Sequence, residues 1–393
     1  MFVYADNAAT TRVHPEVVQA MAPAFEELYG NPSTIYSKGR EAREAIDKAR
    51  EQVAAAINCR PQEIYFTSCG TESDNWAIRG IAKHYGEKKG KHIISTNIEH
   101  HAVLETLKAM EKEGYSVTFL PVNEEGFVTA QQVKEAIRPD TVLITVMTAN
   151  NEIGSIQPIE EIAKIAKEHG IFFHTDAVQA VGHIPVDVQA MGVDLLSLSG
   201  HKFHAPKGIG ALYVRRGVLP DNLMHGGGQE RSRRPGTENI AGILALGAAI
   251  ERAVNNLDRD MTHVAALRDK LIDGIVKTIP HCKVNTPGHD RLPGTVNVSI
   301  KYIEGESLLL LLDMNGICTT SGSACASGDL DPSHVLLAIG LPHEIAHGSV
   351  RFSFCADNTE EEVDYILEVL PRIAARLREM SPLWENVKDK DTL

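Results

Sequence analysis

The 393-residue sequence lacks several features that mark common classes of protein. No apolar run approaches the length needed to cross a bilayer, and the longest spans only Leu308 to Leu312. Positive charge is also scarce, since 39 Lys and Arg stand against 52 Asp and Glu. The net charge of -13 argues against a non-specific nucleic-acid-binding protein. The N-terminus shows no basic segment followed by an apolar stretch, so we expect no signal peptide and a cytoplasmic protein that binds neither membranes nor nucleic acid.

Cysteine is sparse, and several cofactor fingerprints are missing. The six cysteines are scattered without CxxC pairs, which predicts reduced thiols rather than a disulfide framework. No GxGxxG follows an expected strand and no GxxxxGK[ST] occurs, so the signatures of dinucleotide and nucleoside-triphosphate sites are absent. A zinc site at His201, His204 or the His100–His101 pair is a remote alternative, because no HExxH or clustered His/Cys set supports it.

The first 215 residues do contain a regular alternation of short apolar runs and longer helical patterns. Apolar runs without polar alternation, each separated by a helix, are typical of a mostly parallel sheet covered on both faces. The expected strands are residues 63–67, 92–95, 117–120, 142–146, 171–174, 195–198 and 209–214.

The pattern changes after Val214, where a Gly- and Arg-rich loop leads into helices expected at 240–255 and 261–278. Shorter strands and helices follow, which predicts a smaller α+β domain. We therefore expect an N-terminal segment (1–14) packed on the small domain, a large domain (15–255) and the small domain (256–393).

Polar residues follow five of the expected strands. Ligands bind beyond the carboxyl ends of strands in open α/β sheets, so these positions predict a site. The segments are Ser68–Glu72, Glu99–His101, Thr148–Glu152, Thr175–Gln179 and Ser199–Lys202.

Each of these segments alone has an ordinary interpretation as a helix cap, a turn or a solvated side chain. Together they favour pyridoxal phosphate. That cofactor needs a lysine for a Schiff base, an acidic partner for its pyridine nitrogen and donors for its phosphate. Lys202, Asp176 and the Gly70–Thr71 helix start are of the right chemical types.

The same residues make the chain resemble the cysteine desulfurases of the nitrogen-fixation and iron–sulfur-cluster type. These are class V aminotransferase-like enzymes that depend on pyridoxal phosphate. The resemblance covers nearly the whole chain and implies an α/β fold, with an aminotransferase-like (fold type I) large domain and a smaller α+β domain. It is carried by Tyr4–Thr11, Gly30–Ser33, Asn150–Gly154, His174–Gln179, Ser199–Lys202, Arg234–Asn239, Ser321–Cys325 and Val350–Ser353.

The resemblance implies catalytic roles for three residues. Lys202 would bind the cofactor covalently, His100 would stack on its ring and transfer protons, and the Cys325 thiolate would take the substrate sulfur as a persulfide. Cys325 lies in a segment rich in Gly and Ser, whereas the other five cysteines are interpreted as structural. Cys318 is close enough to Cys325 to leave its role open.

The resemblance also implies binding residues. Asp176 would pair with the pyridinium nitrogen, and Asn151 and Gln179 would bind the ring oxygen. Arg351 would bind the substrate carboxylate, with Asn31 as a second candidate for that pocket. The phosphate ligands would be Gly70, Thr71, Ser199, His201 and, from the partner subunit of a homodimer, Thr237.

The expected activity is conversion of L-cysteine to L-alanine, with sulfur passed to iron–sulfur scaffold proteins or other acceptors. A selenocysteine lyase or another β-eliminating lyase is the alternative on the same fold. A non-catalytic scaffold or sulfur carrier is disfavoured because both Lys202 and Cys325 are present. The chain departs from the family pattern at Tyr36 and Ala205, which affects only the pocket rim and a turn.

Overall fold

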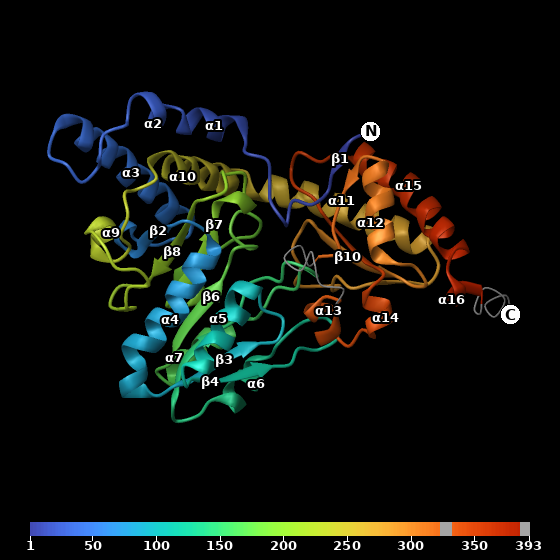
Figure 1. Ribbon diagram of the computed structural model, residues 1–393, viewed down its shortest axis with the longest axis horizontal. Helices are drawn as coiled ribbons and strands as arrows, with labels where there is room; N and C mark the ends of the chain where they lie inside the picture. The colour runs from blue at the N-terminus through green and yellow to red at the C-terminus, as the bar shows by residue number, and fades with distance from the viewer. Residues whose placement is uncertain (323–331, 386–393) are drawn as a thin grey trace.

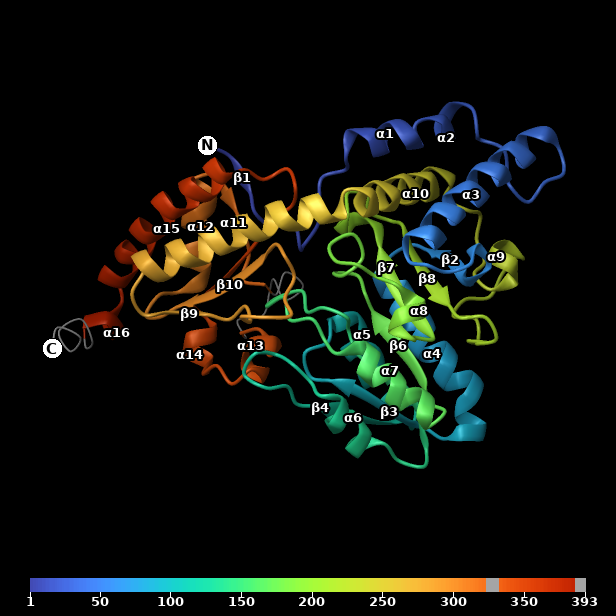
Figure 2. The same cartoon turned by 180° about the vertical axis from the view of Figure 1, so that it is seen from behind.

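The computed structural model describes residues 1–322 and 332–385, which form two lobes (Figure 1). The larger lobe holds a seven-stranded sheet, and the smaller lobe holds a three-stranded sheet. Two consecutive helices, α10 (Ile240–Asn255) and α11 (Leu257–Thr278), carry the chain from the large lobe to the small one (Figure 2).

The large sheet has the strand order β2-β8-β7-β6-β5-β3-β4. All neighbours are parallel except those of β8, which is antiparallel to β2 and to β7. The mostly parallel sheet is therefore confirmed, and every expected strand is present. The strands are β2 (Ile64–Thr67), β3 (His92–Thr96), β4 (Ser116–Leu120), β5 (Thr141–Thr145), β6 (Phe172–Asp176), β7 (Leu195–Ser199) and β8 (Gly210–Val214).

The sheet is buried on both faces, as its apolar runs predict. Along β7, Leu196 and Leu198 pack in one cluster while Leu195 packs in another on the opposite face. The second cluster is formed with α4 (Gly70–Lys89) and α5 (His101–Lys112). The first includes side chains of α3 (Ser37–Ala56), α6 (Ala130–Ala136), α7 (Ile159–Glu168), α8 (Val188–Met191) and α10.

Helix α7 shows how the sequence sets this arrangement. Its buried residues Ile159, Ile162, Ala163 and Ala166 follow helical spacing, so one face packs on the sheet. Glu160 and Glu161 lie in the first turn, where a carboxylate interacts favourably with the helix dipole.

The small lobe has the strand order β12-β10-β9 and its own apolar cluster. These strands are β9 (Cys282–Val284), β10 (Thr295–Ile300) and β12 (Ser349–Ser353). Strand β1 (Val3–Tyr4) pairs in parallel with β11 (Ile317–Cys318). The remaining helices here are α12 (Gly305–Met314), α13 (His334–Ala338), α14 (His343–Ala346), α15 (Glu360–Glu379) and α16 (Pro382–Glu385).

One boundary of the sequence interpretation is wrong. We expected a helix from Met261, but α11 begins at Leu257, leaving only Asn256 between it and α10. Asp258 and Asp260 lie in the first turn of α11 and favour this earlier start. The remaining short helices of the large lobe are α1 (Pro15–Met21), α2 (Pro23–Glu26) and α9 (Gln229–Ser232).

Within the described residues, no single helix combines the length and apolar composition of a membrane span. Helices α10 and α11 meet that criterion only as a pair, and they are bent by 73° where they join.

Candidate functional site

A cavity of about 260 Å³ lies where the carboxyl edge of the large sheet meets the small lobe. Its wall combines residues that are far apart in the sequence, from Ala8 to Arg351. Most of the predicted site residues line it, which brings the strand-end groups together as expected. These are Gly70, Thr71, His100, Asn151, Asp176, Gln179, Ser199, His201, Lys202 and Arg351.

Lys202 is placed by a short 3-10 turn (Gly200–Lys202) that follows β7 directly. Its Nζ donates hydrogen bonds to the carbonyl oxygens of Ala8 and Ala9, at 2.7 and 2.8 Å. Neither alanine was predicted to be part of the site, although both belong to the Tyr4–Thr11 motif. The amine is therefore held at the cavity wall by the N-terminal segment.

Asp176 ends β6 and is buried, with its Oδ1 accepting a hydrogen bond from Val178 N at 2.9 Å. Burial raises its pKa to about 6, while the Val178 N–H and the Lys202 charge act in the opposite direction. A cation beside Asp176 would offset the cost of burying its charge. Asp74 also lines the cavity, and burial together with the Asp176 charge raises its pKa well above the usual value. Sequence reasoning missed Asp74, because nothing in a helical pattern marks a buried carboxyl.

The histidines of the cavity are neutral near pH 7. Burial first, and then the Lys202 charge, lowers the pKa of His100 to about 4. Its Nδ1 accepts a hydrogen bond from Ala102 N at 3.1 Å, so the ring proton is on Nε2. Burial likewise lowers the pKa of His201 to about 4, and its Nδ1 lies 3.1 Å from Thr10 Oγ1.

The start of α4 forms a cradle for an anion. A Cβ on Gly70 would lie 2.7 Å from Val178 Cγ2, so a larger residue does not fit without displacing Val178. No side chain caps this helix start, and the buried Ser199 Oγ has no hydrogen-bond partner among the described residues. Free N–H groups at a helix start and an unsatisfied buried hydroxyl are the groups that a phosphate would satisfy. These phosphate-binding groups lie in the same cavity as the Asp176 carboxyl and the Lys202 amine. Together they fit pyridoxal phosphate.

Arg351 in β12 is 2% exposed and reaches the cavity from the small lobe. Its Nη1 donates to the carbonyl oxygen of Asn151 at 2.7 Å, and its Nη2 pairs with Asp6 Oδ1 at 2.8 Å. Asp6 was not among the predicted site residues, because it is 345 positions from Arg351 in the sequence and contacts it only in the folded chain.

Three predicted residues are not placed in this cavity. Thr237 is exposed and does not line it, so one chain does not bring Thr237 to its own site. Asn31 is also exposed, and its Oδ1 accepts a hydrogen bond from Ser33 N at 2.9 Å. The expectation that Asn31 shares the Arg351 pocket is therefore not met within a single chain. Cys325 lies outside the described residues.

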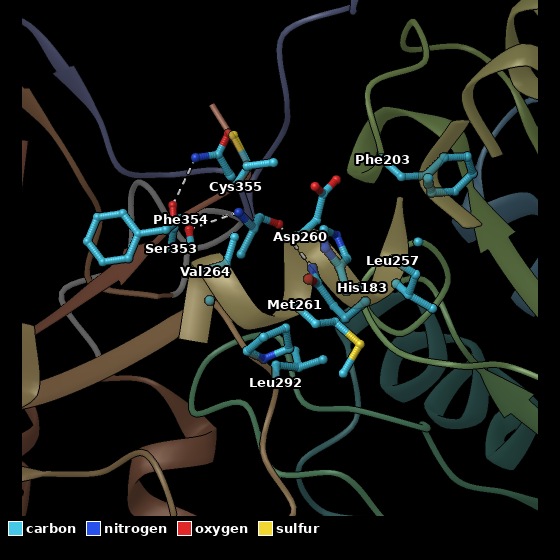
Figure 3. Close-up of a pocket in the computed structure, with 18 of the residues that line it drawn as sticks. His183, Phe203, Leu257, Asp260, Met261, Val264, Leu292, Ser353, Phe354 and Cys355 are labelled. Carbon is cyan, nitrogen blue, oxygen red and sulfur yellow. Dashed lines mark hydrogen bonds between the residues drawn. The ribbon is translucent and has the colours of Figure 1, made fainter. Parts of the chain in front are cut away.

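A second cavity, of about 60 Å³, shares Ala8 and Gln179 with the first and lies near the start of α11 (Figure 3). His183 lines it and its Nε2 lies 3.0 Å from the carbonyl oxygen of Lys202. Cys355 also lines it, and burial raises the pKa of this thiol to about 11. Burial raises the pKa of Cys59 to about 12. Cys355 and Cys59 are therefore protonated thiols of low reactivity.

Cys69 differs from those two because it lines the first cavity as the residue before α4. From the sequence, Cys69 was interpreted as structural only. No group of three or more His, Cys, Asp or Glu side chains in the described part of the chain is arranged to hold a metal ion.

Glu99 lies behind the cavity and is fully buried. Its carboxylate accepts hydrogen bonds from Met147 N at 3.0 and 3.1 Å and from Thr96 Oγ1 at 2.7 Å. Burial nevertheless raises its pKa to about 8.

We expect the contribution of Glu99 to the stability of the cofactor-free protein to fall as the pH rises from about 5 to about 8. Because the pKa of folded Glu99 exceeds its ordinary value of 4.5, this carboxyl binds more protons in the folded chain than in the unfolded chain over this interval. The stabilising contribution is complete below that ordinary value and is lost as the pH rises through 8, a loss on the order of a few kcal/mol. Urea unfolding of the wild type and Glu99→Gln at both pH values measures it. The stability of Glu99→Gln relative to the wild type should rise between the two pH values, and an unchanged difference would contradict this assignment.

Comparisons with known proteins agree with this geometry. The aminotransferase class-V family model matches residues 3–366. A protein named cysteine desulfurase IscS from Clostridium botulinum is 57% identical over 99% of this chain and 98% of its own length. One of the same name from Methanosarcina thermophila is 56% identical over 97% of this chain and 94% of its own length.

Solved structures of NifS-like proteins have the same fold as this chain. A NifS-like protein has a TM-score of 0.90 and 42% identity, covering 96% of this chain and 100% of that one. A NifS-like protein from Rickettsia africae has a TM-score of 0.86 and 29% identity, covering 95% of this chain and 100% of that one. The chain therefore belongs to the class-V aminotransferase family and, within it, to the cysteine desulfurases.

Proposed function

We propose that this protein is a pyridoxal-phosphate-dependent cysteine desulfurase that converts L-cysteine to L-alanine and passes the sulfur on as a persulfide. One observation carries the proposal. A single cavity combines Lys202, the buried Asp176 carboxyl and the uncapped start of α4 with its unsatisfied Ser199 hydroxyl. These are the three groups that hold this cofactor.

In the proposed site each side chain has a distinct role. Pyridoxal phosphate, when bound, supplies an electron sink for the α-carbon of an amino acid. Asp176 would carry the negative charge that balances a protonated pyridine nitrogen, and Ser199 and the α4 N–H groups would hold the phosphate. Lys202 provides the amine for covalent attachment. His100, neutral with its proton on Nε2, is suited to donate or accept a proton at that atom.

Sulfur transfer is assigned to Cys325. The thiolate attacks the sulfur of the bound substrate, so a new S–S bond forms as the C–S bond of cysteine breaks. The electron pair of the C–S bond stays with the substrate carbon, which takes up a proton to become alanine. Gly322 and His334, on either side of the undescribed stretch, both line the cavity, which supports this assignment. A thiol reductant or an acceptor protein then removes the sulfur.

We further propose a homodimer in which Thr237 reaches the site of the partner subunit. Thr237 is exposed and does not line the cavity of its own chain, which supports this proposal. Phe25, Tyr29 and Ile35, which are 67%, 68% and 91% exposed, form apolar surface suited to a subunit interface. A cytoplasmic location is proposed because the five described cysteines are free. Two of the apolar clusters lie largely within one lobe each, which supports domains divided near residue 255.

The function is tested by assaying purified, cofactor-loaded protein with L-cysteine and a thiol reductant. We expect alanine and sulfide in equal amounts, because the proposed reaction transfers one sulfur for each alanine released. Parallel assays with L-selenocysteine separate the alternatives. Alanine from selenocysteine but none from cysteine would identify a selenocysteine lyase and contradict the proposal.

A further inference from the structure

The guanidinium of Arg351 is already paired with the carboxylate of Asp6 before any substrate is present. Nη1 is bonded to the Asn151 carbonyl, and Nη2 is paired with Asp6 Oδ1. The remaining nitrogen, Nε, is buried without a hydrogen-bond partner among the described residues. A carboxylate that enters the cavity and binds Arg351 therefore shares this guanidinium with Asp6.

Asp6 cannot easily move away, because its backbone is fixed to the strand that carries Arg351. Asp6 bridges to Ser353 of β12, and the Ser353 N–H donates to the carbonyl oxygen of Ala5 at 2.7 Å. The next residue, Asn7, donates from its backbone N–H to the Ser353 carbonyl at 3.2 Å. The carboxylate of Asp6 is itself mostly buried, with 19% of its side chain exposed. It is therefore an ordered ion pair rather than a surface contact.

A second carboxyl also faces this region. Glu152 lines the cavity, and its Oε2 accepts a hydrogen bond from Ser333 Oγ. Burial raises the pKa of Glu152, whereas the Ser333 hydrogen bond and the Arg351 charge act to lower it. No ion pair between Glu152 and Arg351 is found in the described chain. Asp6 is the carboxylate in direct contact, so the competition for Arg351 involves Asp6.

We propose that Asp6 is an internal competitor for Arg351, which lowers the affinity of the site for the carboxylates of both substrate and product. The inference rests on the proposed function, because it takes the cavity to be the amino-acid site. In the cofactor-free and substrate-free protein, Asp6 keeps the buried guanidinium paired. When an amino acid binds, its carboxylate and Asp6 lie near the same cation and repel each other. Product release is favoured for the same reason, since alanine carries the same carboxylate.

The test compares the wild type with Asp6→Asn, using ligands that differ in a single group. 3-Mercaptopropionate has the carboxylate and thiol of cysteine but no amine, so calorimetry on the cofactor-free protein compares carboxylate binding between the wild type and the variant. Cysteamine has the amine and thiol but no carboxylate. We expect Asp6→Asn to bind 3-mercaptopropionate about tenfold more tightly, because the competing charge is gone. In the loaded enzyme, KM for L-cysteine should fall similarly, whereas the affinity of the cofactor-free protein for cysteamine should be unchanged.

Three control variants make the result specific. Asp6→Glu keeps the charge, so it should retain the weak binding of the wild type. Asp357→Asn removes an exposed carboxylate elsewhere on the small lobe and should change nothing. Asp6→Ser serves if Asp6→Asn does not fold. Unchanged or weaker 3-mercaptopropionate binding in the neutral variant, or an equal change with cysteamine, would overturn the proposal. Failure of the function itself looks different, since the wild type would then not turn over L-cysteine.

Discussion

Lys202→Ala is expected to lose the visible absorbance of covalently bound pyridoxal phosphate and to reduce alanine formation by at least about a thousandfold. Lys202 is the lysine that lines the cavity, and its Nζ is already held there by the Ala8 and Ala9 carbonyls. The substitution removes both the covalent attachment and an amine positioned to transfer protons. Absorbance spectra and alanine assays of wild type and variant, loaded under the same conditions, measure the effect.

Lys207→Ala is the matched control, because Lys207 belongs to the same loop but is exposed. It should keep both the absorbance and the activity. A Lys202→Ala protein that retained the visible band and wild-type turnover would show that another amine holds the cofactor. Circular dichroism of both variants distinguishes loss of chemistry from loss of the fold.

Cys325→Ala is expected to keep the cofactor and bind L-cysteine but to release no sulfide to a reductant. The substitution leaves every described residue of the cavity unchanged, so the cofactor spectrum should be that of the wild type. The sulfur of the bound substrate would have no thiolate to attack it. Sulfide and alanine release, measured beside the spectrum, separates binding from transfer.

The other cysteines provide a stringent control for this prediction. Cys355→Ala and Cys59→Ala should release sulfide normally, since burial keeps both thiols protonated. Cys69→Ala is the critical comparison, because Cys69 lines the cavity. If Cys69→Ala abolished sulfide release while Cys325→Ala retained it, the nucleophile would be Cys69.

The parts of the fold and site that follow local patterns could be predicted from the sequence. The helix at Ile240–Asn255 and the strands of the large sheet were predicted to within two residues, because apolar periodicity is a local property. The strand-end rule then placed Lys202, Asp176 and His100 at one sheet edge, and all three line one cavity.

Contacts between distant segments could not be predicted in this way. The carbonyls of Ala8 and Ala9 reach Lys202 across more than 190 positions, and Asp6 reaches Arg351 across 345. Asp74 was missed for a different reason, since its burial depends on which face of α4 packs behind the cavity. These residues can be identified as parts of the site only from the folded structure, in which the two lobes and the N-terminal segment are in contact.

One single-turnover measurement tests whether the Lys202 cavity transfers the sulfur of cysteine to Cys325. Wild-type holoenzyme is incubated with one equivalent of L-cysteine per chain and no added thiol, because excess cysteine would itself reduce the persulfide. Alanine is quantified beside peptide mass spectrometry of the chain. The account predicts about one equivalent of alanine per chain and a persulfide on the peptide that contains Cys325. Alanine formed with no persulfide on that peptide, or with the persulfide on Cys69, would contradict it.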